Sequence, residues 1–321
     1  MSITRIAVAG STGYSGQEFL KLLSRHSQFR LAAKIGREEN VESLGGKVDL
    51  AVLCTPNEIS LEMAPKLLAQ GIHVIDVAGA FRLKRHAYPE WYGFEHASKE
   101  WLARAEYALV PWRKLAPARE GEARLIANPG CFPTATLMAL LPLLKSGFVD
   151  PARLVIDAKS GTTGAGRKAE VRLLFSELEG EFQPYKVGRH QHWPEIVEAT
   201  AQFADLEINP VFVTELLPVS RGISVAIFGE WSKRPAGGAA DLLKVFEEAY
   251  AGEPDVSVGA DPALLSMKSV VNTNRVHIHV AEAYGRPVVF SVIDNLVRGA
   301  AGQAMLNANA LAGISLRDGL T

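Results

Sequence analysis

The sequence predicts a protein of two domains, an α/β domain built on a parallel sheet and a second α+β domain with a mixed sheet. Its 321 residues exceed a single hydrophobic core, which usually stops growing at about 250 residues. Residues 3–77 alternate short apolar runs with segments of helical spacing, a pattern typical of βαβ units. After Pro151 the sequence changes to β-rich runs that long loops separate. We therefore expect domains at 1–150 and 151–298, with a C-terminal helix in 299–321 completing the first.

Each element of the first domain has its own signal. Residues 3–9 form a β-branched and alanine run that ends at Gly10, and residues 15–26 carry Leu and Phe at helical spacing. Further strands are predicted at 29–35, 48–53, 72–77 and 125–127, and further helices at 60–70, 98–105 and 134–145. Between 78 and 121 the periodicity weakens, which predicts a long irregular connection around one helix.

The second domain is predicted from its apolar runs. Strands are expected at 154–158, 211–215, 223–229, 275–283 and 288–293. Residues 232–240 are expected to form a surface insertion, and the alanine-rich residues 300–311 form a helix that returns to the first domain.

Composition excludes several classes of function. The 34 Lys and Arg balance 35 Asp and Glu, so no excess of charge favours a nucleic acid or an anionic membrane. The most apolar stretch, 134–144, is about half as long as a membrane-spanning helix, and the N-terminus lacks a signal-peptide pattern. We expect a cytoplasmic protein. Its two cysteines can form neither a disulfide framework nor a multi-cysteine zinc site, so no metal is expected.

Residues 10–16 read Gly-Ser-Thr-Gly-Tyr-Ser-Gly between a predicted strand and a predicted helix. This spacing lets a pyrophosphate reach the helix N-terminus, where open N–H groups and the helix dipole favour anions, as in a Rossmann domain. A plain glycine turn is the alternative. After the second strand, a cation at Arg37 suits the 2′-phosphate of NADP(H) better than the ribose of NAD, although Glu38 and Glu39 adjoin it. The predicted cofactor residues here are Gly10, Ser11, Thr12, Gly13, Tyr14, Ser15, Gly16 and Arg37.

Cys131 is the candidate nucleophile. It lies between a Pro-Gly turn and an apolar helix that has Pro133 near its start, so its sulfur should lie at the helix N-terminus. A helix N-terminus stabilises a thiolate, which attacks acyl carbons and can form a thioester. A buried, inert cysteine is the alternative, and we assign it to Cys54, which ends an apolar strand.

Two histidines, His190 and His192, precede a predicted helix start. A histidine can hold a cysteine as the thiolate and later protonate a substrate oxygen. A metal pair would need further ligands, and the sequence shows no convincing cluster. His277 and His279 alternate on a predicted strand, and for them a structural role is favoured.

Two loops complete the candidate set. Residues 159–168 are rich in glycine and hydroxyl groups, and their backbone N–H groups suit a phosphate or a nicotinamide; a flexible surface loop is the alternative. Residues 294–303 resemble a loop entering a helix with amides that could contact a cofactor. We predict cofactor contacts by Ser160, Gly161 and Asn295, and substrate contacts by Arg113, Asn128 and Arg167.

These motifs occur together in one order. They are residues 10–16, 128–134 (Asn-Pro-Gly-Cys-Phe-Pro-Thr), 160–167, 190–196 (His-Gln-His-Trp-Pro-Glu-Ile), 221–223 and 294–303. As a set they resemble the N-acetyl-gamma-glutamyl-phosphate reductases of arginine biosynthesis, and the resemblance covers most of the chain. It implies an NADPH-dependent reduction of a small acyl phosphate to a semialdehyde through a thioester on Cys131. It also implies His192 as the acid/base with His190 assisting, and a Rossmann domain joined to a catalytic and dimerisation domain like that of aspartate-semialdehyde dehydrogenase, in a homodimer or homotetramer.

The chain departs from the family pattern at four places. Phe132 replaces a common tyrosine, Gln191 a common arginine, and residues 77–80 and 109–113 also differ. These changes leave two other substrates open, a carrier-bound aminoadipyl phosphate of lysine biosynthesis and an aspartyl phosphate. A non-catalytic NADP-binding sensor is an alternative of another class. Which histidine transfers the proton also stays open.

Overall fold

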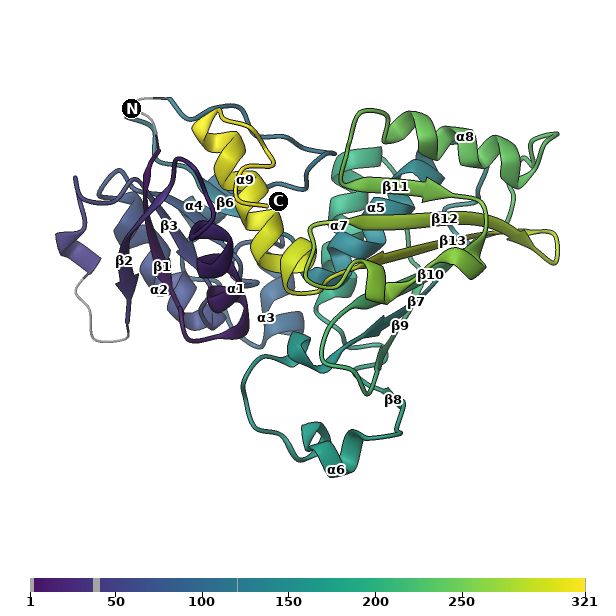
Figure 1. Ribbon diagram of the computed structural model, residues 1–321, viewed down its shortest axis with the longest axis horizontal. Coiled ribbons are helices and arrows are strands. Elements are labelled where there is room, and N and C mark those ends of the chain that lie inside the picture. Colours follow the sequence, from purple (N-terminus) through teal and green to yellow (C-terminus); the bar gives the residue numbers. More distant parts are fainter. Residues whose placement is uncertain (1–2, 37–40, 120, 321) are drawn as a thin grey trace. The chain divides into compact units, whose positions relative to one another are not determined.

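The computed structural model describes residues 3–36, 41–119 and 121–320, which divide into two compact units (Figure 1). Unit 1 comprises residues 1–130 and 300–321, and unit 2 comprises residues 131–299. The expected boundary at 150 differs from this division. Residues 131–145 form a helix that contacts the sheet of unit 2, so they group with that unit.

Unit 1 is built on a six-stranded parallel sheet with the order β2-β1-β3-β4-β6-β5, which confirms the predicted parallel α/β architecture. Its strands are β1 (Arg5–Ala9), β2 (Arg30–Ile35), β3 (Leu50–Leu53), β4 (His73–Asp76), β5 (Glu106–Tyr107) and β6 (Leu125–Ala127). The strands β1, β3, β4 and β6 are almost wholly buried, as continuous apolar runs between two helical layers should be.

The helices of unit 1 are α1 (Tyr14–Leu23), α2 (Asn57–Leu68), α3 (Tyr88–Tyr92), α4 (Lys99–Arg104) and α9 (Gly302–Ala312). The strand order reverses between β1 and β3, and right-handed crossovers on each side of such a reversal place α1 and α2 on opposite faces. Helix α9 packs against α1 and contacts β4, so the C-terminal segment belongs to this unit. Helix α4 confirms the helix predicted at 98–105, whereas α3 lies where an irregular connection was expected.

Unit 2 contains a seven-stranded mixed sheet with the order β11-β12-β13-β10-β7-β9-β8, which confirms the predicted α+β architecture. Its strands are β7 (Val155–Ser160), β8 (Gln183–Pro184), β9 (Val211–Leu216), β10 (Ile223–Phe228), β11 (Val256–Gly259), β12 (Val276–Ala283) and β13 (Arg286–Ile293). Residues on β7 and β9 alternate between buried and partly exposed, so one face of the sheet carries the core.

The helices of unit 2 are α5 (Cys131–Lys145), α6 (Phe175–Leu178), α7 (His192–Ala204) and α8 (Ala239–Ala249). Helix α5 contacts β10 and β13, and α7 and α8 pack against α5, so the three form one layer (Figure 1). Residues 132–144 of α5 are all buried. The helix begins three residues before the predicted start because Pro133 fits the first turn, where its missing N–H group costs nothing. The prediction of a loop at 232–240 is wrong for its last two residues, because α8 begins at Ala239.

Candidate functional site

The glycine turn of unit 1 joins β1 to α1. Gly10 has a φ of +70°, and a Cβ atom built there would lie 2.1 Å from the carbonyl oxygen of Cys54. A Cβ atom on Gly16 would lie 2.3 Å from the carbonyl oxygen of Gly10. Side chains are therefore excluded at both positions, and the backbone stays open for close approach of a pyrophosphate to the α1 N-terminus. Residues 11–15 all keep exposed surface.

This turn lies where the strand order of the sheet reverses, the position at which α/β sheets bind their ligands. The end of β2 lies beside the end of β1, since Ile35 pairs with Ala9. Gly36 follows this strand end and is the last residue described before position 41. Arg37 itself lies outside the described residues. The glycine turn therefore leaves room for a pyrophosphate, and contact of Arg37 with the cofactor stays a prediction.

Cys131 is the first residue of α5, the 15-residue buried helix of unit 2, and it keeps part of its surface exposed. The expected position at a helix N-terminus is confirmed. Both cysteines of the chain are thiols. Open N–H groups and the dipole of α5 favour a negative charge on the sulfur, which is the reactive form of cysteine.

The histidine pair lies at the start of α7, the helix that packs against α5. The ring of Phe132, which follows Cys131, meets His190 and His192 edge-on, at centroid distances of 5.4 and 5.9 Å. The two imidazole rings are 4.8 Å apart. The structure therefore brings together the cysteine segment and both predicted histidines, which 58 and more residues of sequence separate.

The environments of the two histidines differ. His190 is buried among Phe132, Tyr185 and Phe212, and its Nδ1 accepts a hydrogen bond of 3.1 Å from the backbone N–H of His192. Burial, with a smaller contribution from Lys186, lowers the pKa of His190 to about 3. His190 is therefore neutral near pH 7, with its proton on Nε2. His192 begins α7.

These geometries can be compared with known proteins. A reductase of Laribacter hongkongensis (strain HLHK9), named N-acetyl-gamma-glutamyl-phosphate reductase, is 40% identical over 98% of this chain and 97% of its own length. A relative of the same name from Thiobacillus denitrificans is 38% identical over 97% of this chain and 96% of its own length. One from Bacillus cereus (strain AH187) is 37% identical over 98% of this chain and 98% of its own length. The chain belongs to the N-acetyl-gamma-glutamyl-phosphate reductase family.

Two domain models support membership of this reductase family. The semialdehyde dehydrogenase dimerisation domain matches residues 131–295, and the semialdehyde dehydrogenase NAD-binding domain matches residues 37–114. Solved aspartate semialdehyde dehydrogenases share the fold. An enzyme of Vibrio cholerae, in complex with ASA, aligns with a TM-score of 0.72 at 18% identity over 98% of this chain and 99% of its own. One of Candida albicans, with NADP, aligns with a TM-score of 0.68 at 15% identity over 97% and 98%.

Residues 159–168 were predicted to bind the cofactor through their backbone N–H groups, but several of these groups already donate hydrogen bonds within unit 2. Gly161, Thr162 and Thr163 donate their backbone N–H groups to the carbonyl oxygens of residues 222, 219 and 220. The reason given from the sequence is therefore wrong for these three amides. Ser160 is buried and donates to the Gly161 carbonyl oxygen. Cofactor contact by Ser160 and Gly161 stays a prediction.

Asn295 ties this loop to its neighbour. Its Nδ2 donates to Thr163 Oγ1 at 2.9 Å, and its Oδ1 accepts the N–H of Gly222 at 2.8 Å. Beside it, Arg221 forms a two-point ion pair with the buried Asp294. Sequence reasoning gave no role to this ion pair, because nothing local links positions 73 residues apart.

The three predicted substrate residues are placed differently. Arg113 in unit 1 is half-exposed and pairs with Glu106 at 3.4 Å. Asn128 is fully buried, and its side chain donates to the Ala300 carbonyl oxygen at 3.3 Å. Arg167 in unit 2 is exposed. Their contacts with substrate stay predictions.

Tyr185 is a site residue that sequence reasoning missed. Its ring lies 5.6 Å from that of His190, and burial, followed by the charge of Cys131, raises the pKa of its hydroxyl. Tyr185 is therefore a neutral phenol that can donate a hydrogen bond near the sulfur. Only its position five residues before His190 could have signalled it.

The other cysteine and histidines keep their structural interpretation. Burial, with a contribution from Asp76, raises the pKa of the Cys54 thiol to about 12, so it stays protonated. His277 and His279 lie on β12. Within residues 3–36, 41–119 and 121–320, no cluster of three or more metal-binding side chains occurs, and no helix is long and apolar enough to cross a membrane.

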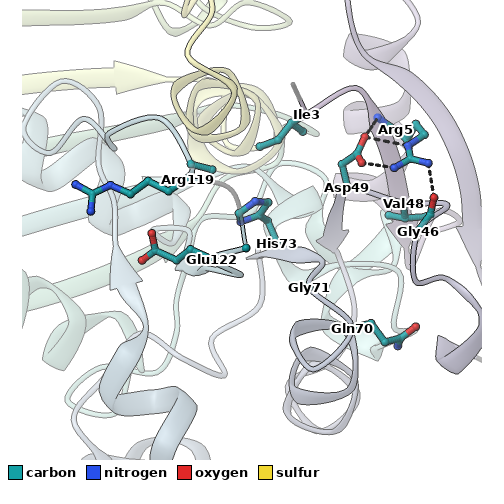
Figure 2. A pocket seen from close by; sticks show the side chains of 12 residues that line it. Ile3, Arg5, Gly46, Val48, Asp49, Gln70, Gly71, His73, Arg119 and Glu122 are labelled. Carbon is teal, nitrogen blue, oxygen red and sulfur yellow. Dashed lines mark hydrogen bonds and ion pairs between the residues drawn. The ribbon is translucent and has the colours of Figure 1, made fainter. Parts of the chain in front are cut away.

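A cavity of about 210 Å³ opens at another place in unit 1 (Figure 2). Arg5 in β1 and Asp49, the residue before β3, form an ion pair on one side of it, and His73 and Glu122 lie on another. These residues stand at the N-terminal ends of the strands, whereas the glycine turn follows the C-terminal end of β1. No residue predicted for the site lines this cavity.

Proposed function

We propose that the chain catalyses the NADPH-dependent reductive dephosphorylation of N-acetyl-gamma-glutamyl phosphate to N-acetylglutamate semialdehyde, a step of arginine biosynthesis. The observation that carries the proposal is the grouping of Cys131, at the start of α5, with the two histidines that contact Phe132. Relatives that are 37–40% identical over 97–98% of this chain bear the name of the enzyme for this reaction.

The cysteine supplies covalent catalysis. Its thiolate attacks the acyl carbon of the acyl phosphate, the C–O bond to phosphate breaks, and a thioester on Cys131 remains. When bound, NADPH supplies a hydride to an electrophilic carbon. The C–S bond then breaks, the semialdehyde leaves, and Cys131 returns to the thiolate. Negative charge develops on the carbonyl oxygen at each addition, so hydrogen-bond donors must face that oxygen.

We assign the proton transfer to His192, with His190 in a supporting role. The low pKa of His190 keeps it neutral, and its Nδ1 accepts the backbone N–H of His192, so it orients the start of α7. A group with a pKa near 3 is a poor general acid near pH 7 because almost none of it carries the proton. His192, at the helix N-terminus beside Phe132, is the better candidate.

The cofactor assignment rests on the glycine turn. Residues 10–16 would hold the pyrophosphate, and Arg37 would pair with the 2′-phosphate of NADP(H). Ser160, Gly161 and Asn295 would contact the nicotinamide end. Arg113, Asn128 and Arg167 would bind the substrate's phosphate or carboxylate. We assign nucleotide binding to residues 1–130 with 300–321, and catalysis and dimerisation to 131–299.

The assembly is proposed to be a homodimer located in the cytoplasm. The dimerisation-domain model matches 131–295, which supports association through unit 2. A homotetramer, as two such dimers, is the larger form to be tested.

The reverse reaction tests the function. Phosphate-dependent reduction of NADP is measured with N-acetylglutamate semialdehyde, aspartate semialdehyde and an aminoadipate semialdehyde analogue, and NAD is compared with NADP. We expect the first substrate with NADP to have the highest kcat/KM. The highest value for another aldehyde would reassign the substrate, and no turnover with any of them would leave the sensor interpretation.

The variant Cys131→Ser tests the mechanism. Because serine at this position lacks the reactive thiolate, turnover should fall at least about 1,000-fold while the affinity for NADPH, measured by fluorescence, stays within about twofold. The matched control Cys54→Ser should keep activity within about threefold, since the raised pKa of the Cys54 thiol keeps it protonated and unreactive. Retained turnover in Cys131→Ser would refute the thioester.

A further inference from the structure

Asp294 is a fully buried carboxylate in unit 2 with a complete set of partners. Arg221 donates to it through Nε and Nη2 at 2.9 and 3.0 Å. The backbone N–H groups of Leu296 and Val297 donate to Oδ1 at 2.8 Å each, and that of Asn272 donates to Oδ2 at 2.7 Å. Five charge-assisted hydrogen bonds thus hold this side chain in one position.

The segment that follows Asp294 is a short π-helical turn, Val297–Ala301. The carboxylate of Asp294 binds the first N–H group of the turn, and its backbone carbonyl oxygen accepts the N–H of Gly299 at 2.9 Å. One residue therefore fixes the turn at its start and at its middle. Single π-helical turns are rare and occur frequently at functional sites.

Gly299 brings this turn against the nucleophile. A Cβ atom built on Gly299 would lie 2.7 Å from the Cβ of Cys131 and 3.1 Å from its Cα. The φ of Gly299 is not in the left-handed region, so backbone conformation does not require glycine here. What requires glycine is the close approach to Cys131.

We propose that Asp294 and Gly299 are positioning residues for the reaction. Asp294 fixes the π-helical turn. The backbone of Gly299, which has no side chain, packs against Cys131 and fixes the position of the Cys131 side chain. The same carboxylate holds the guanidinium of Arg221, so this cation and the nucleophile share one rigid support. A displacement of a nucleophile by about 1 Å can cost about 100-fold in rate. The proposal rests on the proposed function of Cys131 as the nucleophile.

The test uses Gly299→Ala in the full chain, with Gly45→Ala as the matched control. An added Cβ at Gly45 would meet only the Gln70 side chain, at 3.4 Å from its Oε1 and at 3.7 Å and 3.9 Å from its Cβ and Cγ, which are ordinary contacts. In Gly299→Ala we expect kcat to fall about 100-fold, KM to change less than about threefold, and the affinity for NADPH to stay unchanged. Gly45→Ala should keep kcat within about twofold. Wild-type kcat in Gly299→Ala would overturn the proposal.

A second readout does not depend on turnover. The rate at which iodoacetamide alkylates Cys131, measured without substrate across a range of pH, should fall at least about fivefold in Gly299→Ala. Cys131→Ser gives the background from Cys54. If the wild type alkylates rapidly at Cys131 yet reduces no acyl phosphate, the proposed function fails, whereas equal alkylation rates in wild type and Gly299→Ala overturn the positioning role.

If Gly299→Ala does not fold, the variant Asp294→Asn tests the same proposal. Asparagine keeps the shape but loses the charge that pairs with Arg221, so the turn loosens while the packing survives. We expect kcat and the alkylation rate both to fall about tenfold, with Asp294→Glu restoring neither because its longer side chain cannot occupy the same position. Folded Asp294→Asn with both rates unchanged would also overturn the proposal.

Discussion

At the residue scale, the site depends on a histidine that stays neutral. His190 is enclosed by aromatic rings and accepts a backbone hydrogen bond, so protonating it would break that bond and bury a charge. The pKa of His190 is therefore low because the ring is buried and its Nδ1 must stay unprotonated to accept the hydrogen bond at the start of α7. This explains why two histidines separated by one residue can take different roles.

The lowered pKa of His190 predicts a pH dependence of stability. Its pKa is about 3 when folded and 6.5 when unfolded, so below pH 6.5 the unfolded chain binds the proton first. The stabilisation present above pH 6.5 is therefore lost progressively toward pH 3. At pH 5 the free energy of unfolding should fall by about 2 kcal/mol more in the wild type than in His190→Asn, which keeps an acceptor but does not titrate.

Urea denaturation at pH 5 and pH 7.5 measures this difference. His86→Asn, a change at an exposed histidine, should show the wild-type loss between the two pH values. If His190→Asn loses as much stability as the wild type, the buried imidazole is not the titrating group.

Residue chemistry was predictable where it follows from short sequence motifs. Cys131 was found from the turn before it and the apolar helix after it, and the histidines from their spacing before a helix. Tyr185 and the Arg221–Asp294 pair could not be found in this way. Their roles come from strands and loops that meet only in the folded unit, and no local pattern encodes such a meeting.

At the element scale, α5 shows why some helices are easy to predict. Its apolar residues leave almost no polar face, so only a buried helix of this length is compatible with the sequence. Helix α8 was not predicted because the glycines and the proline before it are typical of a loop. Its own apolar residues nevertheless recur at helical spacing. The two-residue strands β5 and β8 depend on their neighbours rather than on propensity.

Helix α9 is held to unit 1 by a buried amide. Asn307 donates through Nδ2 to the carbonyl oxygen of Ala108 and to Oδ1 of Asn128, both at 3.1 Å. Asn307→Ala removes both bonds and leaves Asn128 Oδ1 without this donor. We expect the free energy of unfolding to fall by about 1–3 kcal/mol, measured by urea denaturation followed by circular dichroism.

Gln202→Ala on the exposed side of α7 is the control for this helix contact, with an expected change within about 0.5 kcal/mol. An equal effect of the two substitutions would show that the buried amide does not anchor α9.

At the scale of the whole molecule, length and alternation were enough to predict two domains but not where they divide. The sequence changes character after residue 150, whereas the contacts change at residue 130. The sequence of a helix does not indicate which sheet the helix packs against. Helix α5 belongs to unit 2 because its apolar surface packs on β10 and β13, and this is decided by tertiary contacts alone.

Residues 171–187 form an apolar arm of unit 2, which carries α6 and projects from the rest of the unit (Figure 1). Val171 and Phe175 are 73% and 77% exposed, and Leu174, Phe182 and Val187 are also exposed. A monomeric protein rarely leaves such a group of apolar side chains uncovered. Because the dimerisation-domain model spans this arm, we expect a second copy of the chain to cover it.

The double variant Val171→Asp/Phe175→Asp should therefore weaken the proposed homodimer. Two buried apolar side chains contribute about 3–5 kcal/mol, so the dissociation constant should rise at least about 100-fold in sedimentation velocity. Leu264→Asp, at an equally exposed apolar residue outside the arm, should leave the dimer intact. Dissociation caused by Leu264→Asp and not by the double variant would place the contact elsewhere on unit 2.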